Sequence, residues 1–199
     1  MGRAQFEPAH FLEAARDLAA ANGPAAVTVG SVTTRLGAPT GSFYHRFASR
    51  DVLLGELWLK TVLAMQQGFV AAIDRGDGLG AALHVPAWSR EHLDDARLLL
   101  LHHRDDFVHG DWPAALKQGV ADQARRFVDC LARIAAETFG GTGAEPLRLA
   151  RFVLADVPIA AVRAHLERRE PPPLLVDDLI RTTYRAVVNE FGRGGARRS

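Results

Sequence analysis

"GAPTGSFYHRF", residues 37–47, decides how the chain is interpreted, because it joins a tight turn to a short aromatic helix. Gly37 is suited to end one helix, and Pro39 suits the first turn of the next, where its missing N–H would have no partner. Only Ala38 lies between these two residues. Two short helices joined by a tight glycine-containing turn predict a helix-turn-helix unit.

The helix ahead of this turn is predicted from its cap and its apolar face. Thr28 is a suitable N-cap, because its hydroxyl can accept from the free N–H groups of a helix that begins at Val29. Ser31 stands where a capping box prefers Glu or Gln, so we expect the box to be incomplete. Val29, Val32 and Leu36 are spaced to form the inner face of this helix.

The second helix of such a unit lies in the major groove of DNA, with its N-terminal residues against base edges. Gly41 has no side chain and would let the backbone come close to the duplex. Thr40 and Ser42 offer short hydroxyls that can reach base edges or phosphate oxygens. This stretch therefore predicts a DNA contact.

The aromatic residues divide between the two faces of this short helix. Phe43 and Phe47 are four positions apart, so we expect both to turn inward and hold the helix against the two before it. Tyr44 and His45 then point outward, where a phenol and an imidazole can donate to phosphates.

Three arginines lie between positions 28 and 50, namely Arg35, Arg46 and Arg50, and this stretch holds no acidic residue. The formal net charge of the whole chain is only +1, so contact with nucleic acid must come from a local patch. We expect these arginines to form that patch, with Arg50 just ahead of the following helix. In the alternative interpretation, the aromatic residues belong to an ordinary core and the arginines to a solvated surface. This alternative fits the whole spacing less well.

Turn signals divide the rest of the chain into helices. We expect longer helices over about 53–75, 114–140, 146–168 and 174–191, since their apolar residues recur at helical spacing. The predicted fold is all-α, with an N-terminal three-helix helix-turn-helix domain and a larger helical bundle. The expected domains are residues 1–50 for DNA binding, 51–192 for effector binding and dimerisation, and 193–199 as a flexible basic tail.

Composition favours a soluble cytoplasmic protein that has no contact with membranes. The chain is 48% hydrophobic and 24% charged, which is typical of a globular protein, and it shows no signal peptide. Its longest aliphatic run, Leu98–Leu101, is far too short to span a bilayer. A single cysteine, Cys130, cannot form an intramolecular disulfide, which suits a reducing compartment.

A family resemblance begins in the turn and extends outward from it. "VTVGSVTTRLGAPTGSFYHRFASRDVLLGEL" (27–57) resembles the DNA-binding segment of TetR/AcrR-type bacterial transcriptional regulators, and "FLEAARDLAAANG" (11–23) resembles their first helix. The resemblance implies a homodimer that binds a double-stranded DNA operator and a small-molecule effector, more commonly as a repressor. It also implies phosphate or base contacts from Thr28, Thr40, Tyr44, His45 and Arg50. The full set of expected DNA-binding residues is Thr28, Arg35, Pro39, Thr40, Gly41, Ser42, Tyr44, His45, Arg46 and Arg50.

The sequence departs from the family pattern at a few positions. Pro39 stands where a capping serine is usual, and Thr33 where a small alanine is common. The N-terminal arm offers only Arg3, and Glu7 near the first helix disfavours a phosphate contact there. These departures bear on affinity more than on the mode of binding.

The larger domain is expected to hold an effector pocket, which needs a mostly apolar lining with a few polar groups. Candidate lining residues are Trp88, Phe107, Trp112, Phe127 and Phe152, with Arg97, His103 and Asp156 as polar anchors. For any single aromatic residue among them, a place in the packed core is the better expectation. Asp156 lies among apolar neighbours and needs a partner, which could be a ligand, an arginine across a dimer, or water.

The last two long helices are the candidates for dimerisation. Their expected interface residues are Leu147, Leu154, Val157 and Ala161 on one helix and Leu175, Leu179, Thr183 and Val187 on the other. A helix-turn-helix dimer places its reading helices about one DNA turn apart. A ligand that prefers one dimer geometry would change that spacing and so the affinity for DNA.

Other functions have weaker support. His102, Asp106 and His109 would share a helix face, but no Glu-x-x-His pairs occur on other helices, so we expect no metal site. The chain has no G-x-S-x-G motif, and "GDGLG" (76–80) lacks the spacing of a dinucleotide-binding loop, so we expect neither an enzyme nor a bound cofactor. The remaining alternative is a helical small-molecule-binding protein without operator binding.

Overall fold

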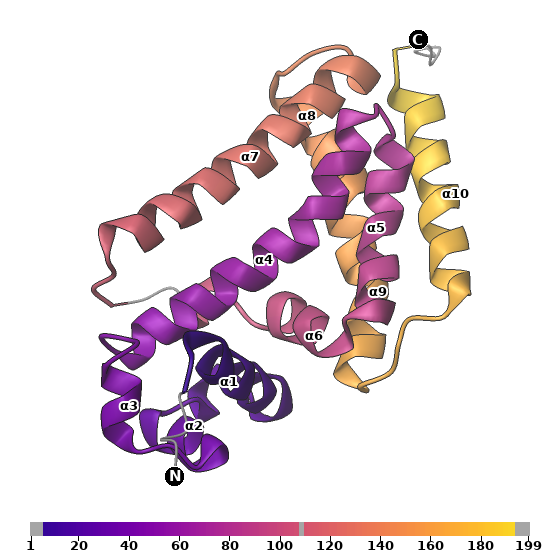
Figure 1. The fold of residues 1–199 in the computed structure, drawn as a ribbon. Helices are drawn as coiled ribbons and strands as arrows, with labels where there is room; N and C mark the ends of the chain where they lie inside the picture. The colour runs from indigo at the N-terminus through magenta and orange to yellow at the C-terminus, as the bar shows by residue number, and fades with distance from the viewer. Residues whose placement is uncertain (1–5, 108–109, 194–199) are drawn as a thin grey trace. The chain divides into compact units, whose positions relative to one another are not determined.

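The computed structural model describes residues 6–107 and 110–193, and every regular element within these ranges is helical (Figure 1). The all-α prediction is confirmed. Arg3, His109 and residues 194–199 of the expected tail lie outside the described residues. The elements are α1 (Pro8–Asn22), η1 (Pro24–Ala26), α2 (Val29–Leu36), α3 (Thr40–Tyr44), α4 (Arg50–Asp74), α5 (Gly78–Glu91), α6 (Leu93–Leu101), η2 (Arg104–Asp106), α7 (Ala114–Phe139), α8 (Ala144–Arg151), η3 (Phe152–Asp156), α9 (Val157–Glu167) and α10 (Leu174–Phe191).

The chain divides into two compact units. The first contains the residues up to Val62 together with Asp94–Ala121, and the second contains Leu63–Leu93 and the residues from Asp122 onward. Helices α4 and α7 each contribute residues to both units. The functional boundary expected between residues 50 and 51 falls inside the first compact unit. Compact units do not test a division by function, so this boundary stays a prediction.

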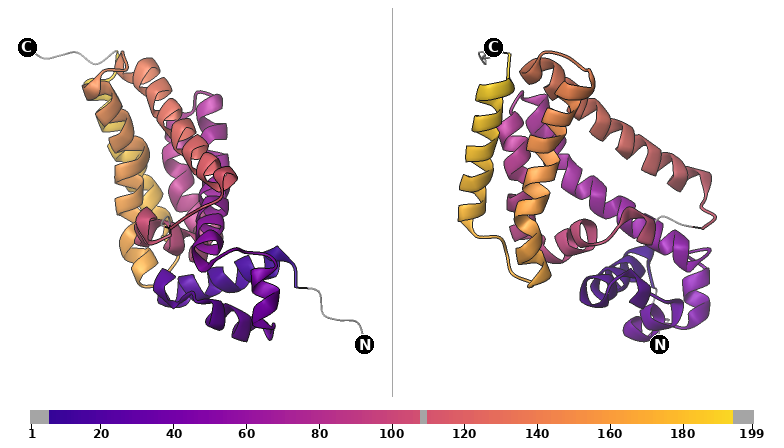
Figure 2. Two further views of the ribbon diagram at one scale, coloured as in Figure 1. Left: turned by 90° about the vertical axis from the view of Figure 1, so that its left-hand side faces the viewer. Right: turned by 180° about the vertical axis from the view of Figure 1, so that it is seen from behind.

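The core of the first unit forms around three phenylalanines. Helices α1, α2 and α3 lie side by side in every view (Figures 1 and 2). Phe43 and Phe47 are 0% and 2% exposed, and their ring centroids lie 5.8 and 6.0 Å from that of Phe11 on α1 in edge-to-face geometry. The prediction that both phenylalanines turn inward and anchor α3 is therefore confirmed.

Later parts of the chain complete this core. The Trp112 side chain is buried against α4, where its indole Nε1–H donates to the Asp51 carbonyl at 3.1 Å. Gly55 on α4 makes room for this ring, because a Cβ at that position would lie 2.5 Å from the indole Cζ2. Phe107 and Leu116 belong to the same buried cluster.

The second unit is built from α5, α8, η3, α9 and α10, with parts of α4 and α7. Gly68 on α4 leaves room for the His84 imidazole of α5, whose Nε2 lies 2.8 Å from the Met65 carbonyl. Cys130, on α7, is buried, and burial raises the pKa of its thiol.

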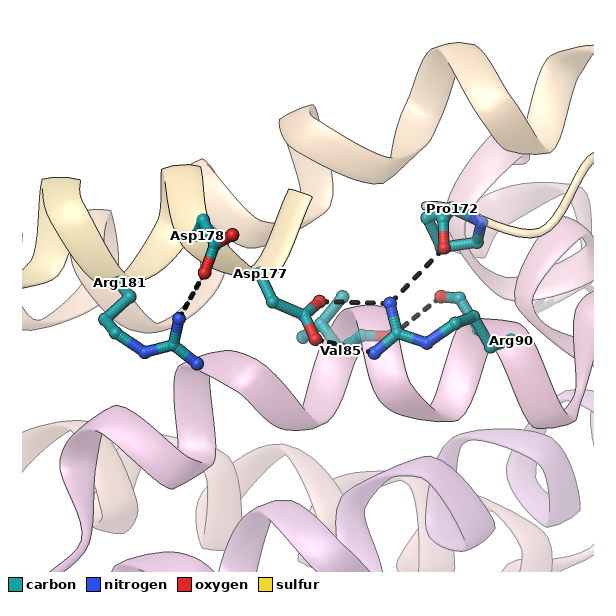
Figure 3. A network of polar contacts seen from close by, with 7 residues as sticks. Val85, Arg90, Pro172, Asp177, Asp178 and Arg181 are labelled. Atoms are coloured by element: carbon teal, nitrogen blue, oxygen red, sulfur yellow. Dashed lines mark hydrogen bonds and ion pairs between the residues drawn. The ribbon is translucent and has the colours of Figure 1, made fainter. Parts of the chain in front are cut away.

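A polar clamp fixes the start of α10 to α5 (Figure 3). The Arg90 guanidinium donates to both carboxylate oxygens of Asp177, at 3.0 and 2.8 Å, and to the Pro172 carbonyl at 3.3 Å. Bidentate pairing of this kind fixes the orientation of both side chains.

The helix expected over 146–168 is present as the continuous run α8, η3 and α9, but its middle is a π-helical segment. Pro158 follows this segment, and its ring nitrogen has no hydrogen to donate to the Leu154 carbonyl four residues earlier. The wider π turn accommodates that missing hydrogen bond. A proline at this position is therefore a local cause of the departure from the expected regular helix.

Candidate nucleic-acid interface

Helix α2 begins with a complete capping box, contrary to expectation. The Ser31 N–H donates to the Thr28 hydroxyl at 2.9 Å, and the Thr28 N–H donates to the Ser31 hydroxyl oxygen at 2.8 Å. The serine side chain thus does what Glu or Gln does in the usual box. The Ser31 hydroxyl also donates to the Ala26 carbonyl at 2.8 Å, which ties the preceding loop to the helix.

Gly37 ends α2 as predicted. Its φ of 62° and ψ of 27° lie in the left-handed region, and its N–H donates to the Thr34 carbonyl at 3.1 Å. Nothing within 4 Å would crowd a Cβ there, so the backbone conformation alone calls for glycine. Thr33, where the family commonly has alanine, is buried with its hydroxyl donating to the Val29 carbonyl at 2.8 Å.

Helix α3 begins one residue later than expected. Pro39 is the N-cap, with an extended ψ of 141°, and Thr40 is the first helical residue. The prediction that Pro39 opens the helix is wrong, because its ψ has not yet turned helical, although its carbonyl accepts from the Ser42 N–H at 2.9 Å. Proline has no side-chain acceptor, so no side chain caps this helix.

The outward face of α3 is open. Thr40, Gly41, Tyr44 and His45 are exposed and Ser42 is half-buried. Tyr44 is 58% exposed, and its ring centroid lies 5.3 Å from that of Phe43 in edge-to-face geometry. A Cβ on Gly41 would meet nothing within 4 Å. Five of the expected DNA-binding residues therefore lie together on one short helix and its C-terminal end.

All three arginines are paired with acids from outside residues 28–50, and for two of them the acid lies on α1 or just before it. The Arg35 Nη2 lies 2.7 Å from Asp17 Oδ2 of α1. The Arg46 Nε donates to the Phe6 carbonyl at 3.2 Å, and its Nη2 lies 3.9 Å from Glu7 Oε1. The expectation of a positive patch without acids is wrong for this reason: the fold brings the acids of the first helix against the arginines.

The Arg50 side chain makes its hydrogen bonds within the first unit. It is the first residue of α4, and its guanidinium donates to the carbonyls of Val27 and Pro24, the latter at 2.9 Å, and to Asp51 Oδ1 at 3.3 Å. These bonds hold the loop that leads into Thr28. The side chain therefore positions the N-terminus of α2, whatever else it contacts.

The structure does not gather the expected effector-binding aromatics in one place. Phe107 and Trp112 are core residues of the first unit, whereas Trp88 is buried in the second. Phe127 packs on Phe69 with ring centroids 5.7 Å apart. Phe152 is exposed. For Trp88, Phe107 and Trp112 the packed-core alternative describes what is found.

The polar residues expected to anchor an effector are divided between the two units. Asp156 is exposed, and it pairs with Arg151, whose Nε lies 3.2 Å from Asp156 Oδ1. Its partner is thus an arginine one turn earlier in the same chain. His103 is exposed and Arg97 is half-buried, both in the first unit.

An open pocket of about 420 Å³ lies on the surface of the second unit, along α4 and beside one residue of α7. It is lined by Leu63, Ala64, Gln66, Gln67, Val70, Ala71, Asp74 and Arg126. None of the residues expected to bind a ligand is among them. Gln66 could have been found from the sequence, since it is a polar residue in an apolar helix; it is buried, and its Nε2 donates to Gln123 Oε1 at 2.9 Å.

The expected dimer residues differ in exposure. Leu154 is fully buried within its own chain, so its side chain cannot contact a second copy, which makes that assignment wrong. Leu147, Val157, Ala161, Thr183 and Val187 are half-buried. Leu175 and Leu179 are 64% and 56% exposed, and Leu174, which is not among the predicted interface residues, is 71% exposed.

Two further observations concern metals and membranes. In residues 6–107 and 110–193, no three His, Cys, Asp or Glu side chains are grouped as a metal site would require; His109 is outside these ranges. None of the helices in the described part of the chain is both long and apolar enough to cross a membrane.

Comparisons with known proteins agree with the geometry of the first unit. Residues 11–57 match the family described as "Bacterial regulatory proteins, tetR family". No curated protein matches the chain.

Solved structures share the fold over nearly the whole chain. The ketosteroid transcriptional regulator KstR2 of Mycobacterium tuberculosis has a TM-score of 0.61 and 18% identity, covering 96% of this chain and 98% of its own. The regulator FadR from Bacillus subtilis, in complex with stearoyl-CoA, has a TM-score of 0.63 and 13% identity, with 92% and 98% covered. SmeT, the repressor of the Stenotrophomonas maltophilia multidrug efflux pump SmeDEF, has a TM-score of 0.62 and 16% identity, with 96% and 93% covered.

Proposed function

We propose that this chain is a ligand-responsive DNA-binding transcriptional regulator, which releases its operator on binding a small molecule. The match of residues 11–57 to the tetR family of bacterial regulatory proteins supports this proposal. The observation that carries this proposal is the form of α3. Two buried phenylalanines, Phe43 and Phe47, fix the helix, while its outward side chains are exposed. A reading helix needs both properties.

The DNA contacts divide by chemistry. The proposed base-reading residues are Thr40 and Ser42 at the start of α3, and the open space at Gly41 between them supports a close approach of the duplex. Tyr44 and His45 at the end of the helix are placed to donate to phosphates. Thr28, exposed at the N-terminus of α2, adds a further hydroxyl, and Arg50 supports it through the preceding loop.

The effector site is proposed in the open pocket along α4. Its lining combines aliphatic side chains with Gln67, Asp74 and Arg126. An apolar molecule that carries a hydrogen-bonding or charged group fits such a lining. The solved relative FadR holds stearoyl-CoA, which also joins an aliphatic tail to a charged head.

Homodimerisation is proposed through the exposed apolar residues of the last helices. Leu174, Leu175 and Leu179 lie exposed on α10, and Phe152 is exposed where α8 meets η3. A contiguous exposed apolar patch commonly marks an association surface. A two-fold dimer would present two α3 helices to one operator.

The test is selection of bound sequences from a random fragment pool with the purified chain. We expect one enriched motif with two-fold symmetry and an affinity that falls steeply as salt rises. Replacing Ser42 by alanine should change the enriched motif, whereas Tyr44→Phe should weaken all sequences alike. Absence of any enriched sequence at low salt would overturn the proposal and leave a helical small-molecule-binding protein as the alternative.

A further inference from the structure

Four charged side chains form a chain of contacts in the first unit. The Arg35 Nη2 of α2 lies 2.7 Å from Asp17 Oδ2 of α1, and Asp17 Oδ1 lies 3.2 Å from Arg16 Nη2. Arg16 Nε in turn lies 4.0 Å from Asp95 Oδ1 of α6. Asp17 thus lies between two arginines, and one of them is on the helix-turn-helix unit.

The Asp17 carboxylate is stabilised in its charged form. Partial burial raises its pKa, but hydrogen bonds from Arg35 and Arg16 outweigh burial and bring the pKa below its ordinary value. The Asp17 carboxylate is therefore available as an anionic partner of Arg35 at neutral pH.

Arg35 lies on the helix that crosses the phosphate backbone in helix-turn-helix complexes. Its planar guanidinium suits a phosphate as well as a carboxylate, so the two anions compete for the same group. Arg46 shows the same arrangement, since it lies against the Phe6 carbonyl and near Glu7. Two cations on the expected DNA face are thus turned toward acids of α1 and its cap.

We propose that Asp17 is an affinity-limiting residue, which holds Arg35 in an ion pair that a DNA phosphate must displace. This inference rests on the proposed DNA binding. Contact with DNA then exchanges one partner of Arg35 for another. An operator complex limited in this way is easier to release.

The test compares variants at Asp17 and at Glu13, an exposed acid on the same helix. Affinities for the selected operator are measured by fluorescence anisotropy over a range of salt concentrations. Asp17→Asn should bind about threefold to tenfold more tightly than the unsubstituted chain. The slope of log K against log salt should steepen by up to about 0.9, the value for one added phosphate contact. Glu13→Gln removes the same charge and should change affinity less than about twofold.

A double-mutant cycle shows whether the effect acts through Arg35. In an Arg35→Gln background, Asp17→Asn should no longer tighten binding. Asp17→Glu keeps the charge and should bind like the unsubstituted chain, while Asp17→Ser provides a second neutral variant if the asparagine variant unfolds. Thermal melting of each variant checks the fold.

The possible failures are distinct. Unchanged affinity in both neutral variants, or tightening that persists without Arg35, overturns the role of Asp17 while the unsubstituted chain still binds its operator. An unsubstituted chain that selects no DNA overturns the inference together with the proposed function.

Discussion

The guanidinium of Arg90 and the carboxylate of Asp177 form a two-pronged contact, with hydrogen bonds of 3.0 and 2.8 Å, that joins α5 to the start of α10 (Figure 3). Their side chains are 24% and 19% exposed, in contrast to the exposed leucines nearby on α10. The clamp therefore fixes the helix that carries the proposed association surface.

Asp177→Asn should lower the free energy of unfolding by roughly 2 kcal/mol, because it leaves a mostly buried guanidinium without its counter-ion. Urea denaturation followed by circular dichroism measures the change. Asp122→Asn breaks the exposed pair with Arg125 and serves as the matched control, for which we expect no resolvable change. Equal stability of the two variants would show that the clamp contributes little.

Gly41→Val should abolish operator binding and leave the fold intact. A Cβ there would meet nothing beyond its neighbours in the chain within 4 Å, and the φ of Gly41 is not in the left-handed region, so folding does not require glycine at this position. In the proposed complex the same side chain would lie between α3 and the duplex. Thermal melting and anisotropy titration measure the two properties, and retention of full affinity would argue against close approach of α3 to DNA.

Gly55→Ala and Gly30→Ala should have opposite effects on stability. At Gly55 a Cβ would lie 2.5 Å from the Trp112 ring, which predicts a loss of about 1–3 kcal/mol through overpacking. At Gly30, inside α2, a Cβ would lie 3.9 Å from the Thr28 hydroxyl oxygen, so alanine should add about 0.5–1 kcal/mol by its helix propensity. Both values come from chemical denaturation, and a stabilised Gly55→Ala variant would contradict the tight packing of Trp112.

His84 should make the folded state less stable in acid. Burial lowers the pKa of its imidazole, although the hydrogen bond to the Met65 carbonyl partly opposes this. Because the unfolded chain then binds the proton more readily, this contribution is present above the ordinary value of 6.5 and is lost as the pH falls through the lowered pKa. His84→Gln should flatten the loss of stability measured by urea denaturation between about pH 7 and 5. An unchanged pH profile of stability in the His84→Gln variant would contradict this role of His84.

Local patterns in the sequence were enough to predict α2, α3 and the turn that joins them. The spacing of Phe43 and Phe47, the Thr28 cap and the Gly37 stop each depend on neighbours a few residues away. Contacts between distant residues were beyond such patterns. Asp17 is 18 positions from Arg35, so the pair appears only once α1 and α2 pack.

The effector and dimer assignments show the same limit. An apolar helical residue such as Leu154 can face its own core or a partner, and periodicity alone does not decide between them. The apolar neighbours of Asp156 in the sequence predict that it needs a partner, but they do not reveal that it is exposed and pairs with Arg151. Helix faces are settled by packing, which a single sequence does not reveal.

The buried position of Cys130 makes the chain convenient for spectroscopy. Its thiol is the only one in the sequence, and burial raises its pKa, so little nucleophilic thiolate is available to a maleimide or a spin label. A cysteine introduced at an exposed site such as Glu13 would take the reporter group selectively. Distances between paired labels in two copies could then be followed as effector is added, without first removing the native cysteine.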